Sequence, residues 1–320
     1  MNKKNRKIIF IIIPIALGFF LIWYSLSKLQ PEDITFIKNS FKTANYFWVV
    51  LSLILGGLSH VSRAIRWQFM LEPMGYKPTF INRILSVFVS YFLNLTIPRS
   101  GEVARATTIS KYEDIPFDKA FGTIVAERIA DVIMLFIIIF IAFLYQANLI
   151  REKLFPDNSN PTKKIILSVV LVILSWVVYT YLSRSKHKFI LKIKSFINGL
   201  KEGVLSIFKM KQKWAFILHT IFIWVMYVLM FYVVTFALPE TKILPFEATI
   251  VGFVVGAISM ALTNGGLGVY PAFVAGVLTM YQVSDNAALA FGWIMWTAQT
   301  VLIIISGALS LFLLPLYNKK

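Results

Sequence analysis

The sequence contains no cysteine, and this absence excludes several kinds of chemistry. The chain can form no disulfide, and it offers no thiolate as a nucleophile or as a metal ligand. It also lacks a Gly-x-Ser-x-Gly elbow, a phosphate-cradling Walker sequence and a pair of zinc ligands. His60 and His219 stand alone in separate hydrophobic stretches, which is typical of structural histidines. The sequence therefore predicts no catalytic residue, no metal site and no cofactor.

Charged residues are few and unevenly divided between the two signs. They make up 15% of the 320 residues, and 32 Lys and Arg against 15 Asp and Glu give a formal net charge of +17. The rest of the chain is apolar, with 58% hydrophobic residues and a mean hydropathy of +0.73. Because the basic residues cluster between long apolar runs, as in cytoplasmic loops of membrane proteins, the charge does not indicate a nucleic-acid partner. The composition predicts an all-α polytopic membrane protein.

Six hydrophobic stretches come near the length of about 20 residues that a membrane-crossing helix needs. They are residues 8–26, 46–69, 124–147, 164–182, 214–237 and 287–314. Two further stretches are too short. Residues 84–97 would form a helix of about 21 Å, against a hydrocarbon core of roughly 30 Å. Residues 249–280 are divided by glycines into two arms of about 15 residues or fewer, again short of a full crossing.

Loop charge predicts how these segments are oriented. The loop 183–213 carries nine basic residues and one acid, which places it in the cytoplasm. Counting from this loop puts both ends of 84–110 inside the cell and both ends of 249–280 outside. Each segment then enters and leaves the membrane by one face, although two tilted crossings in 249–280 would satisfy the same count. Both chain termini are predicted to lie in the cytoplasm. The high usage of aromatic residues, Lys and Asn is typical of an AT-rich bacterial genome, which predicts a bacterial inner membrane as the location.

The resulting order predicts one membrane domain, residues 1–320, built as an inverted repeat. Its halves are residues 46–147, with a re-entrant hairpin at 84–110, and 214–314, with an oppositely oriented hairpin at 249–280. Residues 1–45 are interpreted as an N-terminal helix and external loop, and 148–213 as a connecting helix and basic cytoplasmic loop. Non-helical backbone at membrane depth must be satisfied by protein or a water-filled cavity, so we expect the two hairpin turns to meet beside a polar cavity.

Charged residues on the first hairpin are the leading candidates for binding. Arg99, Glu102 and Arg105 lie at or just after its turn, and two arginines against one carboxylate leave surplus positive charge. A guanidinium group binds phosphate in a bidentate manner, so an anionic lipid headgroup is the expected ligand. The structural alternative is that Glu102 pairs with Arg99 or Arg105 and holds the hairpin together.

Two other charged groups have both a structural and a functional interpretation. Glu127, Arg128 and Asp131 share a helical face, and in the structural interpretation they form an ordinary helix start. In the functional interpretation, Glu127 or Asp131 counters the hairpin arginines or accepts protons during transport. Arg63 and Arg66 end the second crossing, where extension of their side chains into the headgroup region is the favoured interpretation. The alternative places both at the cavity mouth, where they would recruit lipid phosphate.

The two turns supply the remaining candidate binding residues. Glycine-rich turns can present backbone amides to an anion, although a tight turn alone also requires glycine. Two asparagines at corresponding depth are expected to bond the turn backbone. The candidates in the turns are Asn94, Pro98, Gly101, Asn264, Gly265, Gly266 and Gly268.

Four sequence blocks, at residues 63–67, 94–106, 127–131 and 265–269, resemble the lysylphosphatidylglycerol synthase transmembrane family. This is the flippase-like domain of the bacterial multiple peptide resistance factor, and the resemblance covers residues 46–314. It implies movement of lipid between leaflets. We expect no aminoacyl-transferring activity, because the chain ends at Lys320. Tyr270 and Pro271 replace an Arg-Glu pair that is frequent in relatives, which suggests a different lipid.

Three functional hypotheses follow. The first is a transporter that moves an anionic phospholipid or a polyisoprenyl phosphate lipid between leaflets through the cavity. The second is an intramembrane enzyme acting on lipid phosphates, with Glu102, Glu127 or Asp131 as acid or base. The third is a non-transporting subunit of an envelope lipid-modifying complex. The expected partner is an anionic membrane lipid, and the sequence leaves open a separate lipid-modifying enzyme and an oligomer.

Overall fold

The computed structural model describes residues 30–97, 100–146, 207–263 and 265–319, together with Trp23, Ser27 and Leu191. The predicted crossings 8–26 and 164–182 and residues 183–206 of the basic loop lie outside the described residues, apart from Trp23 and Leu191. Pro98, Arg99 and Asn264 also lie outside the described residues. Within the described ranges the secondary structure is entirely helical, as predicted.

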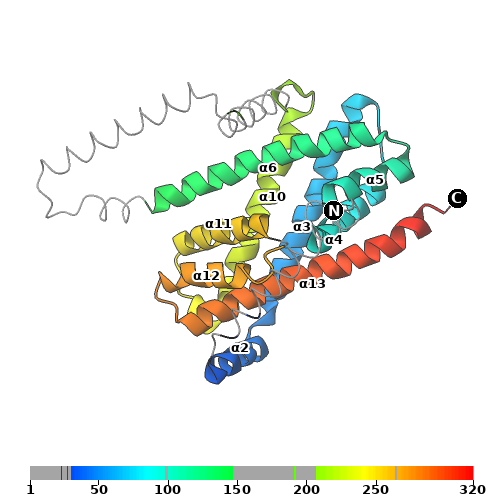
Figure 1. The fold of residues 1–320 in the computed structure, drawn as a ribbon. Coiled ribbons are helices and arrows are strands. Elements are labelled where there is room, and N and C mark those ends of the chain that lie inside the picture. Colours follow the sequence, from blue (N-terminus) through cyan, green and yellow to red (C-terminus); the bar gives the residue numbers. More distant parts are fainter. Residues whose placement is uncertain are drawn as a thin grey trace, which may run out of the picture.

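Nine α-helices are described, and Figure 1 shows their arrangement. Short 3-10 turns follow α3 and α10. The helices are α2 (Pro31–Thr43), α3 (Tyr46–Leu71), α4 (Phe80–Thr96), α5 (Gly101–Glu113), α6 (Phe117–Tyr145), α10 (Lys213–Val234), α11 (Phe246–Leu262), α12 (Tyr270–Thr279) and α13 (Asp285–Tyr317).

Four of the described helical segments are long and apolar enough to cross a membrane. They are Tyr46–Met74, Phe117–Tyr145, Lys213–Ala237 and Asp285–Tyr317, and each contains or overlaps a predicted crossing. The predicted start of the third crossing, at residue 124, was about two turns too late. Pro116 precedes the helix, and Asp118 in its first turn suits the positive end of the helix dipole.

The segment before residue 46, for which the sequence predicted an external loop, contains the helix α2. Pro31 occupies the first turn, and Asp33 Oδ2 accepts a hydrogen bond of 2.9 Å from the backbone N–H of Gln30. Asp33 also accepts a 2.8 Å hydrogen bond from Asn286 Nδ2 on α13. The helix buries Ile37 on its inner face. It escaped detection because it is short, amphipathic and nearly neutral in hydropathy.

The first hairpin consists of α4 and α5, which pack against each other. With 17 and 13 residues they extend about 26 and 20 Å, less than the roughly 30 Å hydrocarbon core. Asn94 Oδ1 accepts a 2.8 Å hydrogen bond from Gly101 N–H, so the expected role of Asn94 in bonding the turn is confirmed. A Cβ on Gly101 would collide with the backbone carbonyl of Ser90. Gly101 is therefore required by the close approach of the two helices.

The second hairpin consists of α11 and α12, with 17 and 10 residues, or about 26 and 15 Å. Gly265, Gly266 and Gly268 have φ values of +61°, +78° and +74°, a backbone region that favours glycine. A Cβ on Gly265 would lie 2.6 Å from the Leu95 side chain, and Trp296 Nε1 donates a 2.8 Å hydrogen bond to the Gly265 carbonyl. The second turn therefore touches the last turn of α4.

The long first helices of the two halves, α3 and α10, pack along each other in opposite directions (Figure 1). Near one end of the pair, the ring centroids of Trp48 and Phe236 lie 5.0 Å apart. Toward the other end, Arg66 Nη1 donates to Thr220 Oγ1 at 3.0 Å. Residue numbers thus rise along one helix as they fall along the other, which defines an antiparallel pair.

Each hairpin packs against the last helix of the other half. At the start of α4, the side-chain amides of Asn82 and Asn318 donate to each other at 2.9 and 2.7 Å, which joins α4 to the end of α13. In the counterpart contact, Tyr145 at the end of α6 packs edge to face on Phe246 at the start of α11. The α4 helix therefore packs against α13, and α11 packs against α6.

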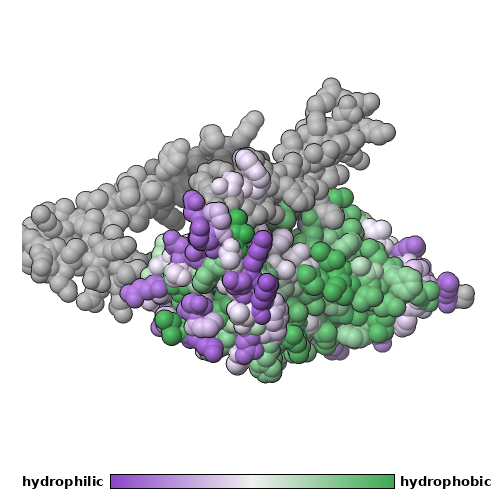
Figure 2. All heavy atoms as spheres, turned by 90° about the horizontal axis from the view of Figure 1, so that it is seen from below, coloured by the Kyte–Doolittle hydropathy of each residue, from purple (hydrophilic) through white to green (hydrophobic). Residues whose placement is uncertain are grey.

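The surface of the described helices carries many exposed aliphatic and aromatic side chains, especially on α6, α10 and α13. Figure 2 shows a broad hydrophobic area between two hydrophilic ones on the face that it presents. Such a surface is stable in lipid and unstable in water. The chain is thus built with a lipid-facing exterior, and its buried polar groups lie between the helices.

Candidate functional site

Arg63 and Arg66 lie inside the helix bundle and do not extend to its surface. They are 3% and 0% exposed, so the favoured prediction that they reach the lipid headgroups is wrong. The α3 helix continues to Leu71, which leaves Arg66 more than one turn before the helix end. Their spacing of three residues places both guanidinium groups on one face of α3, toward α6 and α10.

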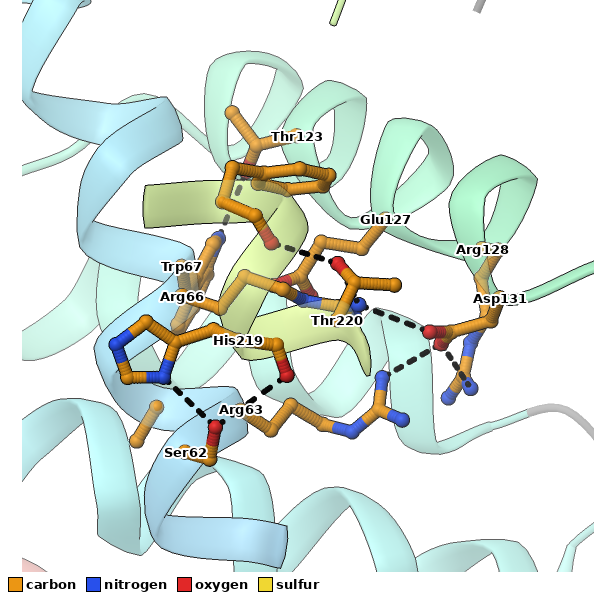
Figure 3. A network of polar contacts seen from close by, with 12 residues as sticks. Ser62, Arg63, Arg66, Trp67, Thr123, Glu127, Arg128, Asp131, His219 and Thr220 are labelled. Atoms are coloured by element: carbon orange, nitrogen blue, oxygen red, sulfur yellow. Dashed lines mark hydrogen bonds and ion pairs between the residues drawn. The ribbon is translucent and has the colours of Figure 1, made fainter. Parts of the chain in front are cut away.

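Asp131 on α6 joins the two α3 arginines (Figure 3). Its Oδ2 lies 2.6 Å from Arg63 Nη1, and its Oδ1 lies 3.0 Å from Arg66 Nη1. Both carboxylate oxygens are therefore used by cations from a neighbouring helix. Removal of a carboxylate in such a setting leaves a buried positive charge without a partner, which is strongly unfavourable.

Glu127, one turn earlier on α6, joins the first hairpin to the same cluster. Its Oε2 lies 2.6 Å from Arg105 Nη1, and its Oε1 lies 3.4 Å from Arg66 Nε. The Arg105 guanidinium carbon also lies 3.8 Å from the centre of the Trp67 ring, whose Nε1 donates to Thr123. The prediction that an acid of the 127–131 group counters a hairpin arginine is confirmed for Arg105.

Glu102 and Arg128 form a second pair at the edge of this cluster. Arg128 Nη2 lies 2.7 Å from Glu102 Oε1, and the two side chains are 38% and 22% exposed. The alternative in which Glu102 holds the hairpin together by pairing with Arg105 is wrong, because Arg105 is directed to Glu127. Glu102 instead ties α5 to α6. Arg128 Nη1 also lies 3.6 Å from Asp131, as their spacing predicted.

Polar side chains of α10 complete the site, and the sequence interpretation missed them. Thr220 accepts from Arg66 at 3.0 Å, and the Tyr227 hydroxyl lies 3.4 Å from Arg63 Nη2 and 3.1 Å from the Tyr91 hydroxyl. Thr220 and Tyr227 are seven residues apart, so they lie two turns apart on one face. This spacing of polar groups within an apolar run is the signal that would have found them.

Arg83 is a further buried arginine that sequence reasoning missed. It is 5% exposed on α4, and its Nη1 donates to the carbonyl of Ala64 at 2.8 Å. Its guanidinium carbon also lies 5.7 Å from the centre of the Phe80 ring. These contacts join α4 to α3, and we interpret Arg83 as a structural residue.

The central cluster carries one surplus positive charge. It contains three buried arginines, Arg63, Arg66 and Arg105, and two buried carboxylates, Glu127 and Asp131. Several guanidinium N–H groups, among them Arg66 Nη2 and both Nε and Nη2 of Arg105, have no hydrogen-bond partner among the described residues. Buried donors of this kind are costly unless a partner accepts from them. The cluster is thus equipped to bind an additional anionic oxygen.

The chemistry of the cluster favours anion binding over metal binding. Within the described parts of the chain, no three His, Asp or Glu side chains converge in a way that could hold a metal ion. Both central carboxylates are already occupied by arginines. His219 lies nearby, and its Nδ1 is 2.8 Å from Ser62 Oγ, so it bonds to the neighbouring helix.

The glycines of the second turn lie apart from these ion pairs. Among the described contacts of this turn, Gly265 meets Leu95 and Trp296, and Gly266 lies close to Tyr270 and Met260. No described interaction joins this turn to the charged cluster. The binding roles of Gly101, Gly265, Gly266 and Gly268 stay predictions, as do those of the three candidates outside the described residues.

A helical, lipid-facing protein with buried arginine–carboxylate pairs between its helices belongs to the class of polytopic membrane proteins. Within that class, the chain belongs to the family described as the lysylphosphatidylglycerol synthase TM region, which matches residues 11–307. The resemblance drawn from the four sequence blocks is therefore confirmed.

Two curated relatives are similar to this chain. A UPF0104 membrane protein of Methanocaldococcus jannaschii is 28% identical over 218 residues, which is 59% of this chain and 63% of the relative. A UPF0104 membrane protein of Pyrococcus horikoshii is 28% identical over 149 residues, which is 44% of this chain and 41% of the relative. The matched part thus spans less than two thirds of either relative. No solved structure matches the chain.

Proposed function

We propose that this protein moves a lipid with an anionic phosphate headgroup between the two leaflets of the cytoplasmic membrane. The observation that carries the proposal is the buried cluster in which three arginines face two carboxylates. A buried positive charge without a counter-ion is unfavourable in a low-dielectric interior. A phosphate group would supply the missing negative charge and accept from the unpartnered N–H groups. An anionic phospholipid or a polyisoprenyl phosphate lipid has this chemistry.

The arrangement of helices supports a transport role for this site. The helices of both hairpins are shorter than a bilayer core, and the second turn contacts the end of α4. We interpret them as re-entrant hairpins of opposite orientation in an inverted repeat, with both chain termini in the cytoplasm. In this architecture, movement of one repeat against the other opens a central site to each side in turn.

The charged cluster connects the elements that would have to move. It joins α5 of the first hairpin to α6, and α6 to α3, while α10 of the second half contributes Thr220. A headgroup bound there would contact both halves. Binding could therefore change the relative stability of two arrangements of the halves, which is what coupling of a ligand to a conformational change requires.

The enzymatic alternative gains no support from this geometry. It requires Glu102, Glu127 or Asp131 as an acid or base, and each of these carboxylates is paired with an arginine. A carboxylate whose oxygens are engaged by a guanidinium group is not free to act on a lipid phosphate. We therefore retain the transport function alone.

The proposal is tested by leaflet exchange of a fluorescent phosphatidylglycerol in proteoliposomes. The informative variant is Arg66→Gln, which removes the surplus charge and leaves the pairs Arg63 with Asp131 and Arg105 with Glu127 in place. We expect it to reduce the rate of lipid exchange by at least about tenfold, because the headgroup loses the hydrogen bonds of one charged donor. Lys77→Gln, an exposed charge change, serves as the control. Equal exchange by wild type and Arg66→Gln, or exchange no faster than in protein-free liposomes, would contradict the proposal.

A further inference from the structure

A groove of about 510 Å³ lies between the first hairpin and α13, on a different flank of α5 from Arg105. Its walls are mainly aliphatic, and α4, α5 and α13 all contribute to them. They include Val89 and Leu93 of α4, Val103 and Ala104 of α5, and Leu311 and Leu314 of α13. The charged cluster has no lining residue in common with this groove, so the groove is a separate feature.

The dimensions of the groove fit a single hydrocarbon chain. It extends along α5 from Ser100 to Lys111, which is about 17 Å at 1.5 Å per residue. A volume of about 510 Å³ over that length gives a cross-section of roughly 30 Å². Apolar walls exposed to lipid gain little from a polar ligand, so an acyl chain is the matching occupant.

A positive charge stands at one end of the groove. Lys111, in the last turn of α5, is exposed, and its Nζ lies 5.1 Å from the centre of the Tyr112 ring. It forms no ion pair with any described acidic side chain. The opposite end of the groove, at Ile97 and Ser100, lies at the turn of the hairpin. A lipid with its phosphate at Lys111 would therefore extend its chain toward the hairpin turn. In the predicted topology Lys111 lies at the cytoplasmic face, so this is the direction of a lipid in the cytoplasmic leaflet.

We propose that this groove binds one acyl chain of an anionic membrane phospholipid whose phosphate pairs with Lys111. The groove holds the lipid beside the first hairpin before its headgroup enters the charged cluster. This order of events rests on the proposed transport function, whereas the binding of lipid in the groove is independent of it. The small side chain of Ala104 keeps the groove open, and Lys111 gives it a preference for anionic headgroups.

The test is photo-crosslinking of the full chain in nanodiscs of phosphatidylcholine that contain a phosphatidylglycerol with a diazirine in one acyl chain. Labelled peptides are mapped by mass spectrometry. We expect adducts on α5 and α13 residues of the groove in excess of those on the lipid-exposed face of α6. Ala104→Phe fills the groove and should lower the groove adducts by at least about tenfold. Its matched control, Ala272→Phe, enlarges an exposed alanine on the second hairpin and should leave them unchanged.

The charge at the end of the groove is tested separately, because Ala104→Phe could also disturb folding. Lys111 is exposed, so Lys111→Gln should leave the fold intact and reduce the preference for phosphatidylglycerol over phosphatidylcholine by about fivefold. Lys111→Arg should retain that preference, and Lys77→Gln is the control for loss of an exposed charge. Groove adducts no more frequent than those on α6, or a preference unaffected by Lys111→Gln, would overturn the inference.

The outcomes separate this inference from the proposed function. Groove labelling that depends on Ala104 and Lys111, without any leaflet exchange, would support the binding site and contradict transport. Exchange that depends on Arg66, without enrichment of label in the groove, would support transport and overturn the groove as the binding site.

Discussion

The two hairpins have similar outlines, but they are built by different means. In the first, side chains form the turn and carry charge: Asn94 bonds Gly101, and Arg105 and Glu102 pair with α6. In the second, glycines with positive φ form the turn, and its described contacts are with Leu95 and Trp296. The first hairpin is thus held to the bundle by ion pairs, and the second by the close fit of its glycine turn.

The largest expected difference between the hairpins is the side of the membrane on which they begin and end. The chain has no native cysteine, so single cysteines can be introduced at Lys77 and Asp118, which flank the first hairpin, and at Lys242 and Met280, which flank the second. A membrane-impermeant thiol reagent should label the first pair from one side only and the second pair from the other. Labelling of Lys77→Cys and Asp118→Cys from opposite sides would show that the first hairpin crosses the membrane.

Loss of the buried acid that serves the first hairpin should have the largest effect on stability. Glu127→Gln leaves Arg105 and Arg66 with a neutral partner in a buried site, and we expect destabilisation of about 3–5 kcal/mol. Thermal unfolding in detergent measures this effect, with the exposed Glu240→Gln as control. The double variant Arg105→Gln with Glu127→Gln removes a whole ion pair and should recover a large part of the loss. An unchanged melting temperature for Glu127→Gln would contradict the account of the cluster.

In the second hairpin, the shape of the turn should matter more than charge. Gly265→Ala forces an alanine into φ +61° and against Leu95, with an expected cost of about 1–3 kcal/mol. Gly276→Ala on α12 is the matched control, because a Cβ there meets nothing within 4 Å and alanine favours helix. The same melting experiment should therefore show destabilisation for Gly265→Ala only. Equal melting temperatures for the two variants would argue against a tight second turn.

The cap of the first turn should make a smaller contribution. Asn94→Ala removes the acceptor for Gly101 N–H, and we expect a loss of about 1 kcal/mol. Asn94→Asp keeps an acceptor oxygen and should restore part of the stability if the loss is due to this hydrogen bond. A loss that Asn94→Asp does not reduce at all would show that the amide acts in some other way.

The outer pair of the first hairpin should have the smallest effect. Arg128 and Glu102 are partly exposed, and ion pairs in such positions contribute about 0–1 kcal/mol. Arg128→Gln should therefore lower the melting temperature much less than Glu127→Gln. A comparable loss from the two variants would mean that the cluster is not divided into an inner and an outer part.

Sequence reasoning identified the charged groups of the site better than it identified their partners. The sequence alone shows two of its features, which are the spacing of Glu127, Arg128 and Asp131 and the excess of arginine near Arg105. It does not show the burial of Arg63 and Arg66, because that burial depends on α10 and α6 lying against α3. Hydropathy alone also ends α3 near its charges, although the helix continues to Leu71.

The fold shows the same division between local and non-local information. Span lengths and turn residues were predicted because hydrophobic runs and glycines are local signals. The α2 helix was missed because its stability comes from capping at Gln30 and Asp33 and from its contact with α13. The seven-residue spacing of Thr220 and Tyr227 is a local signal that places both on one helix face, but it does not name their partners Arg66 and Arg63, which lie on another helix.

The central claim is that the surplus positive charge of the buried cluster binds an anionic headgroup. Native mass spectrometry tests it by measuring how much phosphatidylglycerol the protein binds relative to phosphatidylcholine. Two variants are compared, Arg66→Gln and the double variant that combines Arg105→Gln and Glu127→Gln. The first removes the surplus charge, and the second removes one charge of each sign. The account predicts that the preference for phosphatidylglycerol falls in Arg66→Gln by more than in the double variant. A preference that survives in Arg66→Gln and falls only in the double variant would contradict it.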